Sequence, residues 1–309
     1  MILKKLRARA EKLVDAVRTT CSIYKMSVSR QDNEYYLLQQ AHRLEKGLLY
    51  TNPRKLWGRD KALKMAALLS GLVEHDKFYY RTAMSVLYKY IQAKKASAYP
   101  EDTLLAAEIE DIFAKKNVPL TDYGCGGVLS LTKNEVMMTP YSAIKDVLST
   151  RHSIRSFSDE PVTKEEINEA VRLALRAPSA CNRQAFRVYV SDKSCAAICN
   201  KPFDIQGEKF LVITGIKTAY NNTELFDWIV SAGIFSGYLS LTLHSLGIGC
   251  SVLKKTLKMP QAEEKAIKAY LAIPENEQLC AEIAIGHYPE SFSVPYSNRK
   301  EPEDVVVFK

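Results

Sequence analysis

Several patterns that identify a function directly are missing from this chain of 309 residues. No pair of its seven cysteines is spaced as Cys-x-x-Cys, and no cysteine–histidine group has the spacing of a zinc site. There is no Gly-x-Gly-x-x-Gly motif, which argues against a doubly wound dinucleotide-binding fold. No period of about 20–50 residues recurs, so the chain is not a repeat protein. The function must be sought in less direct patterns.

The sequence also has little that would place the protein in a membrane or outside the cell. The opening residues, MILKKLRARAEKLV, lack the apolar run of about 7–15 residues that a secretory signal requires. The segment 228–253 has no charged side chain and exceeds the ~20 residues that span a bilayer. However, it contains five serines, and Gly247 and Gly249 should end its helix. We expect a buried helix in a soluble protein rather than a membrane-associated scaffold.

The cysteine usage and the charge distribution add two expectations. An odd number of widely spaced cysteines suits buried, reduced thiols, so we expect a reducing, cytoplasmic location. Residues 1–140 hold 23 Lys+Arg against 15 Asp+Glu, whereas residues 141–309 hold 20 of each. Any attraction to an anionic partner therefore belongs to the first part of the chain.

The first part, residues 1–140, is predicted to be all-helical, with apolar positions at helical spacing. The helices are expected at 3–25, 31–49, 60–95 and 101–116, followed by a linker near 124–142. Its role stays open between three interpretations: a basic surface for anionic lipid or nucleic acid, a cover for a binding site, and a solvated helical bundle. We expect no specific nucleic-acid partner.

The second part, residues 141–309, mixes helices and strands and is predicted to be α+β. A helix at 163–177 begins with Thr163 and Glu166, which form a capping-box pattern. The other expected elements are strands at 185–192, 209–217, 250–254 and 281–288, helices at 225–246 and 260–271, and a final strand in VVVF at 305–308.

Three short stretches in this second part carry polar groups; the first suits an anion, and the other two are ordinary loops when taken alone. In an extended segment, Arg151, Ser153 and Arg155 would point the same way, as a row of donors for phosphate. The alternative is a solvated basic strand beside Asp159 and Glu160. PSACN follows the 163–177 helix, and SNRKEPEDV precedes the chain's last residues.

In this order and spacing, the stretches resemble the FMN-dependent nitroreductase family over roughly residues 145–309. The resemblance implies a homodimer with a central, mainly antiparallel sheet flanked by helices, and FMN bound where the subunits meet. It also implies that helix 225–246 packs against its symmetry mate. Residues 1–140 have no part in the resemblance and would be an unrelated extension.

The resemblance assigns roles to particular residues. Arg151, His152 and Ser153 would hold the phosphate and ribityl chain, and Arg155 would reach the N1/C2 edge of the flavin. Pro178, Ser179, Ala180 and Asn182 would approach from the other subunit. Asn200 would be a further binding residue. Gly247 and Gly249 would lie near the N5 atom of the flavin, and Arg299 with Lys300 would lie at the phosphate. No catalytic side chain and no metal are implied, since the flavin carries the chemistry.

The implied activity is reduction of a small oxidant, such as a nitroaromatic, a quinone or a flavin, by NAD(P)H in a ping-pong mechanism. The alternative is a non-catalytic FMN-binding module whose crevice the N-terminal helices cover. Two departures weaken the match: Ala185-Phe186 stands where the family commonly has Pro-Trp, and Ser297 stands where close relatives often have Lys.

Overall fold

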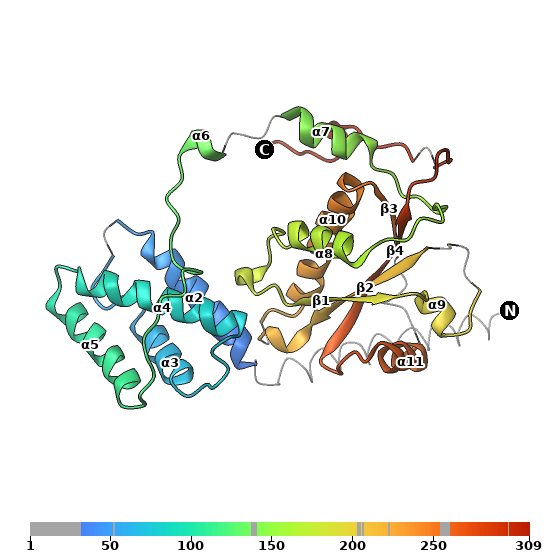
Figure 1. Ribbon diagram of the computed structural model, residues 1–309. Coiled ribbons are helices and arrows are strands. Elements are labelled where there is room, and N and C mark those ends of the chain that lie inside the picture. The colour runs from blue at the N-terminus through green and yellow to red at the C-terminus, as the bar shows by residue number, and fades with distance from the viewer. Residues whose placement is uncertain are drawn as a thin grey trace, which may run out of the picture.

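The computed structural model describes residues 32–51, 53–136, 141–202, 205, 207–221, 223–253, 260–295 and 297–309. Within these residues, a four-stranded antiparallel sheet is flanked by helices and preceded by a helical region, which we define as residues 32–127 (Figure 1). The expected α+β fold is therefore confirmed. The helix predicted at 3–25 lies outside the described residues.

The helical region is a bundle around its own apolar core. Its helices are α2 (Asn33–Leu48), α3 (Arg59–Leu69), α4 (Phe78–Lys95) and α5 (Pro100–Ala114). The single helix predicted at 60–95 is wrong, because the chain leaves the helix at Ser70–Gly71 and starts again at Phe78. This reversal lets α3 and α4 pack against each other, burying Met65, Leu69 and Leu87 completely.

The sheet has the strand order β1-β2-β4-β3, and all neighbours are antiparallel. Its strands are β1 (Phe186–Ser191), β2 (Lys209–Ile216), β3 (Ile248–Leu253) and β4 (Glu277–His287). The register fixes two ends of the sheet. Ser191, Phe210, Ala284 and Ser251 are level at one end, and Phe186, Gly215 and Gln278 are level at the other.

Helices cover both faces of the sheet, because successive strand residues point to opposite sides. Leu211 and Ile213 pack into the core under α8 (Lys164–Ala174) and α10 (Asp227–Ser245). Val212 packs instead against Ile267 of α11 (Gln261–Leu271), with Cys195 of α9 (Cys195–Ile198). The smaller helices are α6 (Lys133–Val136), α7 (Tyr141–Thr150), η1 (Ala180–Asn182), η2 (Lys217–Ala219) and η4 (Pro302–Asp304).

Two local expectations for the second part have opposite outcomes. The capping box at the start of α8 is confirmed: the Thr163 hydroxyl accepts from the Glu166 N–H, and the Glu166 carboxylate accepts from the Thr163 N–H. The final strand at 305–308 is wrong, since these residues pair with no described strand and their side chains are exposed. A strand needs a neighbour, and nothing in the described part of the chain supplies one.

Helix α10 is buried on one side only. Phe235, Leu239 and Leu243 are fully buried, whereas Val230, Ile234 and Tyr238 are exposed. A Cβ added to Gly233 or Gly237 would meet nothing within 4 Å. In the part of the chain that the structure describes, no helix has both the length and the apolar character needed to cross a bilayer.

The described cysteines only partly follow the expectation of buried thiols. Those at 125, 181, 195, 199, 250 and 280 form no disulfide bond with one another. Burial raises the pKa of the Cys250 thiol to about 11, but Cys125 is exposed, so the expectation is wrong there.

The helical region docks on the sheet region through α2. Tyr35 and Leu38 share a buried core with Ala185, Ile216 and Trp228. At the start of α2, the Asp32 N–H donates to the Thr218 carbonyl (3.0 Å), and the Thr218 hydroxyl donates to the Asp32 carboxylate (2.5 Å). Figure 1 shows the helical region beside the end of the sheet where β1 begins.

Candidate cofactor-binding site

The segment 151–158, which contains the predicted cationic row, is fastened to the edge of the sheet. The Ile154 N–H donates to the Cys250 carbonyl (3.1 Å), and the Ser158 N–H donates to the His287 carbonyl (3.0 Å). The Ile154 side chain is 1% exposed, and a Cβ on Gly249 would lie 2.0 Å from its Cδ1. Glycine at 249 is therefore required by the close approach of the protein's own chain.

Alternation along this segment places the cations away from the core. Ile154 points inward, Arg151 and Ser153 are half-buried, and Arg155 is exposed. Among the described residues, no carboxylate lies within 4.0 Å of a guanidinium nitrogen of Arg151 or Arg155. The alternative of a basic strand paired with Asp159 and Glu160 thus gains no support. The row keeps its donors available for an anion.

His244 holds the start of this segment. The Thr150 hydroxyl donates to the Asp146 carbonyl (2.6 Å), so it accepts from the His244 Nε2–H (2.8 Å). His244 Nδ1 then accepts from the Tyr288 hydroxyl, also at 2.8 Å. Burial, and next the charges of Arg151 and His152, lower the pKa of His244. His244 is therefore neutral and makes a hydrogen bond through each ring nitrogen, as expected for a structural residue.

The loop 178–185 carries the second predicted group of ligands. Cys181, Asn182 and Gln184 have φ values of 52°, 51° and 49°, in the left-handed region. Each such residue other than glycine costs roughly 1–2 kcal/mol, less for asparagine. The Ser179 hydroxyl accepts from the Gln184 N–H (3.0 Å), so this side chain shapes the loop as well as being a predicted ligand.

Arg183, which the sequence analysis passed over, anchors this loop from inside. Its side chain is fully buried, donates to the Ala219 carbonyl (2.8 Å), and forms an ion pair with Glu224 through its two terminal nitrogens, Nη1 and Nη2. Burial alone would raise the pKa of Glu224, but hydrogen bonds from Arg183 and Asn221 outweigh it and lower the pKa. An arginine in a polar loop gives no sequence signal of burial.

The remaining predicted ligands are dispersed. Gly247 lies in the turn after α10 with φ 78°, and Gly249 lies inside β3. Asn200 follows α9 and is exposed with φ 52°. Arg299 and Lys300 are exposed, and the Arg299 guanidinium donates to the carbonyl of Ser297.

The structure therefore brings together one group of predicted ligands and separates it from another. Arg151, His152, Ser153 and Gly249 lie at the end of the sheet that includes Ser251. The loop 178–182 precedes Phe186 and lies at the opposite end. Five residue steps along β1 separate the ends by about 17 Å. One protomer does not place both groups around one ligand.

Comparison with known proteins gives a family match over the part of the chain that contains the row from Arg151 to Arg155 and the loop 178–185. Residues 148–218 match the model of the nitroreductase family. This match covers less than half of the chain. The match includes the cationic row, the capped helix α8 and the loop 178–185.

Individual relatives match part of the chain. The Bacillus subtilis protein named "Putative NAD(P)H nitroreductase YodC" is 32% identical over 106 residues, which are 32% of this chain and 52% of the relative. An Archaeoglobus fulgidus protein named "Putative NADH dehydrogenase/NAD(P)H nitroreductase" is 25% identical over 47% of this chain and 84% of its own length. The chain thus spans about half the length of the first relative.

Among solved structures, an FMN-dependent nitroreductase of Clostridium difficile R20291 is 25% identical, with a TM-score of 0.44. The similarity covers 52% of this chain and 96% of that protein.

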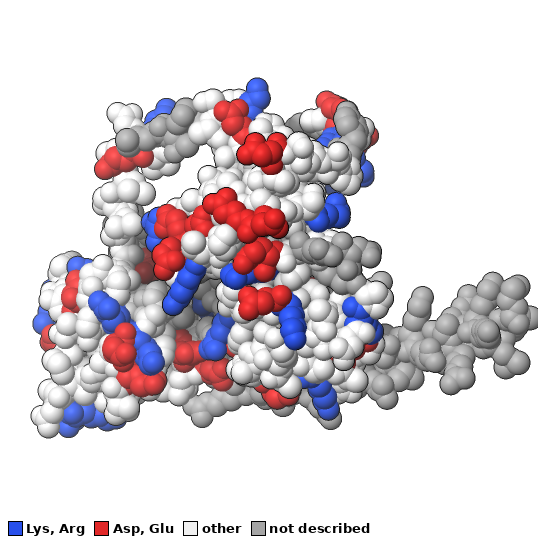
Figure 2. Space-filling view, turned by 45° about the vertical axis from the view of Figure 1, so that its right-hand side comes forward, with Lys and Arg blue, Asp and Glu red and all other residues white. Residues whose placement is uncertain are grey.

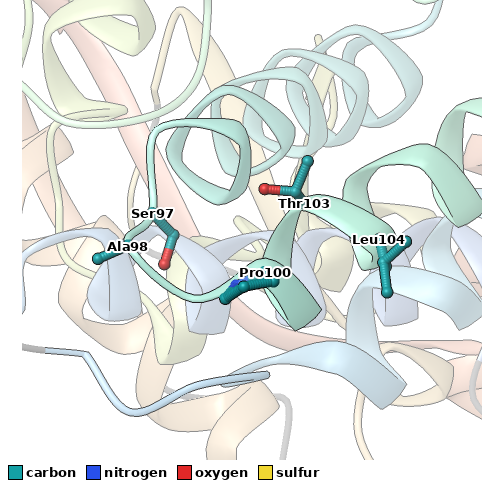
Figure 3. A pocket seen from close by; sticks show the side chains of 5 residues that line it. All are labelled: Ser97, Ala98, Pro100, Thr103 and Leu104. Atoms are coloured by element: carbon teal, nitrogen blue, oxygen red, sulfur yellow. The ribbon is translucent and has the colours of Figure 1, made fainter.

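Surface features of the helical region lie apart from the predicted ligands. A shallow hollow at the start of α5 is lined by Ser97, Ala98, Pro100, Thr103 and Leu104 (Figure 3).

Residues 1–31 hold 8 Lys+Arg against 2 Asp+Glu, so residues 32–140 hold 15 against 13. Most of the basic excess thus lies outside the described residues. Figure 2 shows basic and acidic side chains interspersed on the face it presents.

Proposed function

We propose that this chain is an FMN-dependent oxidoreductase that uses NAD(P)H to reduce a small oxidant, such as a nitroaromatic, a quinone or a flavin, by a ping-pong mechanism. The family match over residues 148–218 supports the class, and both relatives are named as NAD(P)H nitroreductases. The observation that carries the proposal is the row from Arg151 to Arg155, which is held beside β3 within that match and has no carboxylate partner among the described residues. We also propose a division near residue 140 between a helical domain and an FMN-binding domain.

The residues present suit FMN. Arg151 and Ser153 are half-buried donors held by Ile154, and they suit a phosphate and a polyol chain. Arg155 would face the edge of the ring system, where a fixed cation favours the reduced form. Bound FMN would supply the redox chemistry. The protein would orient the cofactor and hold its charge, and no side-chain acid or nucleophile is required.

The proposal includes a homodimer. The row and the loop 178–185 lie at opposite ends of one sheet, so a second copy would complete each site. The exposed apolar face of α10, with Val230, Ile234 and Tyr238 beside two open glycines, supports this arrangement. The exposed apolar residues 305–308 would likewise gain cover from a second copy.

The test compares Arg151→Ala with Arg176→Ala, an exposed arginine at the end of α8. FMN affinity is measured by quenching of flavin fluorescence. Loss of charged hydrogen bonds should weaken binding about ten- to a hundredfold in Arg151→Ala, and leave it unchanged in the control. Equal affinities in the two variants, or a wild-type protein that binds no FMN, would contradict the proposal.

Access of NADH or NADPH to the bound flavin distinguishes the proposed enzyme from a non-catalytic FMN-binding module. Mixing the yellow protein with NADH or NADPH without air should bleach the flavin absorbance, and adding a quinone should restore it. FMN that stays oxidised with both donors would instead favour the module whose crevice is covered by the helical region.

A further inference from the structure

The loop 178–185 has an unusual backbone conformation, which is supported by a buried side chain of the loop itself. Three of its residues are left-handed, and a conformation of this kind persists only where the surroundings determine it. The buried Arg183 lies between two of them, with its guanidinium over the Tyr220 ring at 4.6 Å. Its ion pair with Glu224 is therefore the main internal support of the loop.

Glu224 also connects this support to the helical region. Its carboxylate accepts from the Asn221 amide Nδ2 (2.7 Å) and from Gln39 Nε2 of α2 (3.4 Å). Gln39 is 3% exposed, so this contact lies between the two regions rather than on the surface. The Glu224 carboxylate, which pairs with Arg183, is thus held in place partly by a residue of α2.

Apolar packing makes a second connection between α2 and the loop. Leu38 and Tyr35 are 6% and 7% exposed, in the core that contains Ala185, the last residue of the loop. Ala180, within the loop, packs against the same core. If α2 moved away, both the apolar floor of the loop and one donor to Glu224 would be lost.

We propose that α2 is a positioning element for the loop 178–185, acting through the Leu38 core and the Gln39–Glu224 hydrogen bond. Docking of the helical region then sets how well this loop is formed and, with it, the affinity for FMN. Gln39 and Glu224 are positioning residues that touch no cofactor. The part of the inference that concerns FMN rests on the proposed function, whereas the effect on the loop does not.

The first test measures the order of the loop without cofactor. Hydrogen exchange is followed in the full-length apoprotein at the amides of Asn182, Arg183 and Gln184, which donate within the loop. Leu38→Ala should speed this exchange about tenfold, because local opening becomes easier. The matched control is Leu37→Ala on the same helix, which removes a side chain buried in the core of the helical region and should leave loop exchange unchanged.

A second pair of variants isolates the polar connection. Gln39→Leu removes the donor to Glu224, whereas Gln40→Leu removes an equally buried amide that donates to the Gln39 oxygen Oε1 (3.2 Å) and leaves the Gln39 donor to Glu224 in place. We expect faster loop exchange in Gln39→Leu only. Wild-type loop exchange in both Leu38→Ala and Gln39→Leu would overturn the inference.

FMN titration of the same variants then connects the loop to binding. Affinity should fall in proportion to the gain in loop exchange for Leu38→Ala and Gln39→Leu, and stay unchanged in the controls. A looser loop with unchanged FMN affinity would overturn the connection to the cofactor. A wild-type protein that binds no FMN would remove the proposed function, but the exchange results would still decide whether α2 positions the loop.

Discussion

Replacing Gly249 with alanine tests whether Ile154 fixes the cationic row. The added methyl carbon would lie 2.0 Å from Ile154 Cδ1 and 2.7 Å from Cγ1, with Tyr288 Cε1 at 3.3 Å. Carbon atoms in contact stay about 3.5–4.0 Å apart. Ile154 must therefore move by roughly 1.5 Å, and its β-branched side chain has few other rotamers to adopt. We expect the segment 151–158 to be displaced from β3.

The size of the effect follows from the packing. Overfilling a close-packed site costs about 1–3 kcal/mol of unfolding free energy. Ile154→Ala alone should cost about 2–5 kcal/mol, because a fully buried side chain is truncated. The double variant Gly249→Ala/Ile154→Ala relieves the clash and partly fills the space left by Ile154. Its loss of unfolding free energy should therefore be smaller than the sum of the two single losses by about 1 kcal/mol or more.

The assay is urea unfolding followed by circular dichroism, with FMN titration as a second measurement. Gly249→Ala should also weaken FMN binding, and the double variant should recover part of it. Gly71→Ala is the control, since its Cβ would meet nothing closer than 3.6 Å. Strict additivity of the two single changes, in both stability and FMN affinity, would refute the claim that Ile154 against Gly249 positions the row.

Two further changes address the dimer and the helical region. Gly237→Ala adds a methyl with nothing within 4 Å in one chain, so it should stabilise an isolated protomer by about 1 kcal/mol. In sedimentation the same change should weaken the proposed dimer, and an undiminished dimer would rule out close packing on this face of α10. In the helical region, burial raises the pKa of Asp102, but hydrogen bonds from Lys94, the Leu56 N–H and Ser97 outweigh it and lower the pKa. The stabilisation is therefore complete above the unfolded pKa of about 3.9 and is lost as the pH falls through the lower folded value. Asp102→Asn should abolish most of this acid dependence of thermal unfolding, and an unaltered pH profile would contradict it.

The sequence predicted best those elements whose signals are local. The capping box at Thr163 marked the start of α8 because both hydrogen bonds lie within four residues. Runs of β-branched residues marked β1 and β2 to within one or two residues. These signals do not depend on what the element packs against.

The errors arise where tertiary packing decides. A single glycine costs a helix only about 1 kcal/mol, so Gly71 in a helix-favouring stretch gave no firm sign of the break between α3 and α4. Residues 305–308 have the composition of a strand, but pairing depends on a neighbouring strand, which the described residues do not supply. Within the candidate site, the alternation of Arg151, Ser153 and Arg155 could be read from the sequence, and their role in holding FMN stays a prediction. The burial of Arg183 and its ion pair with Glu224 depend on a partner 41 positions away.

The distance between the two groups of ligands gives the helical region a role beyond its own chain. If the homodimer forms through α10 and a second copy completes each site, as proposed, the loop 178–185 of one copy would lie against the cationic row of its partner. The helix α2 that positions a loop would then act on the FMN held mainly by the partner subunit. Heterodimers that combine a Leu38→Ala chain with an Arg151→Ala chain would place both defects in one site. The other site would keep wild-type FMN affinity, whereas defects acting within each chain would weaken both sites.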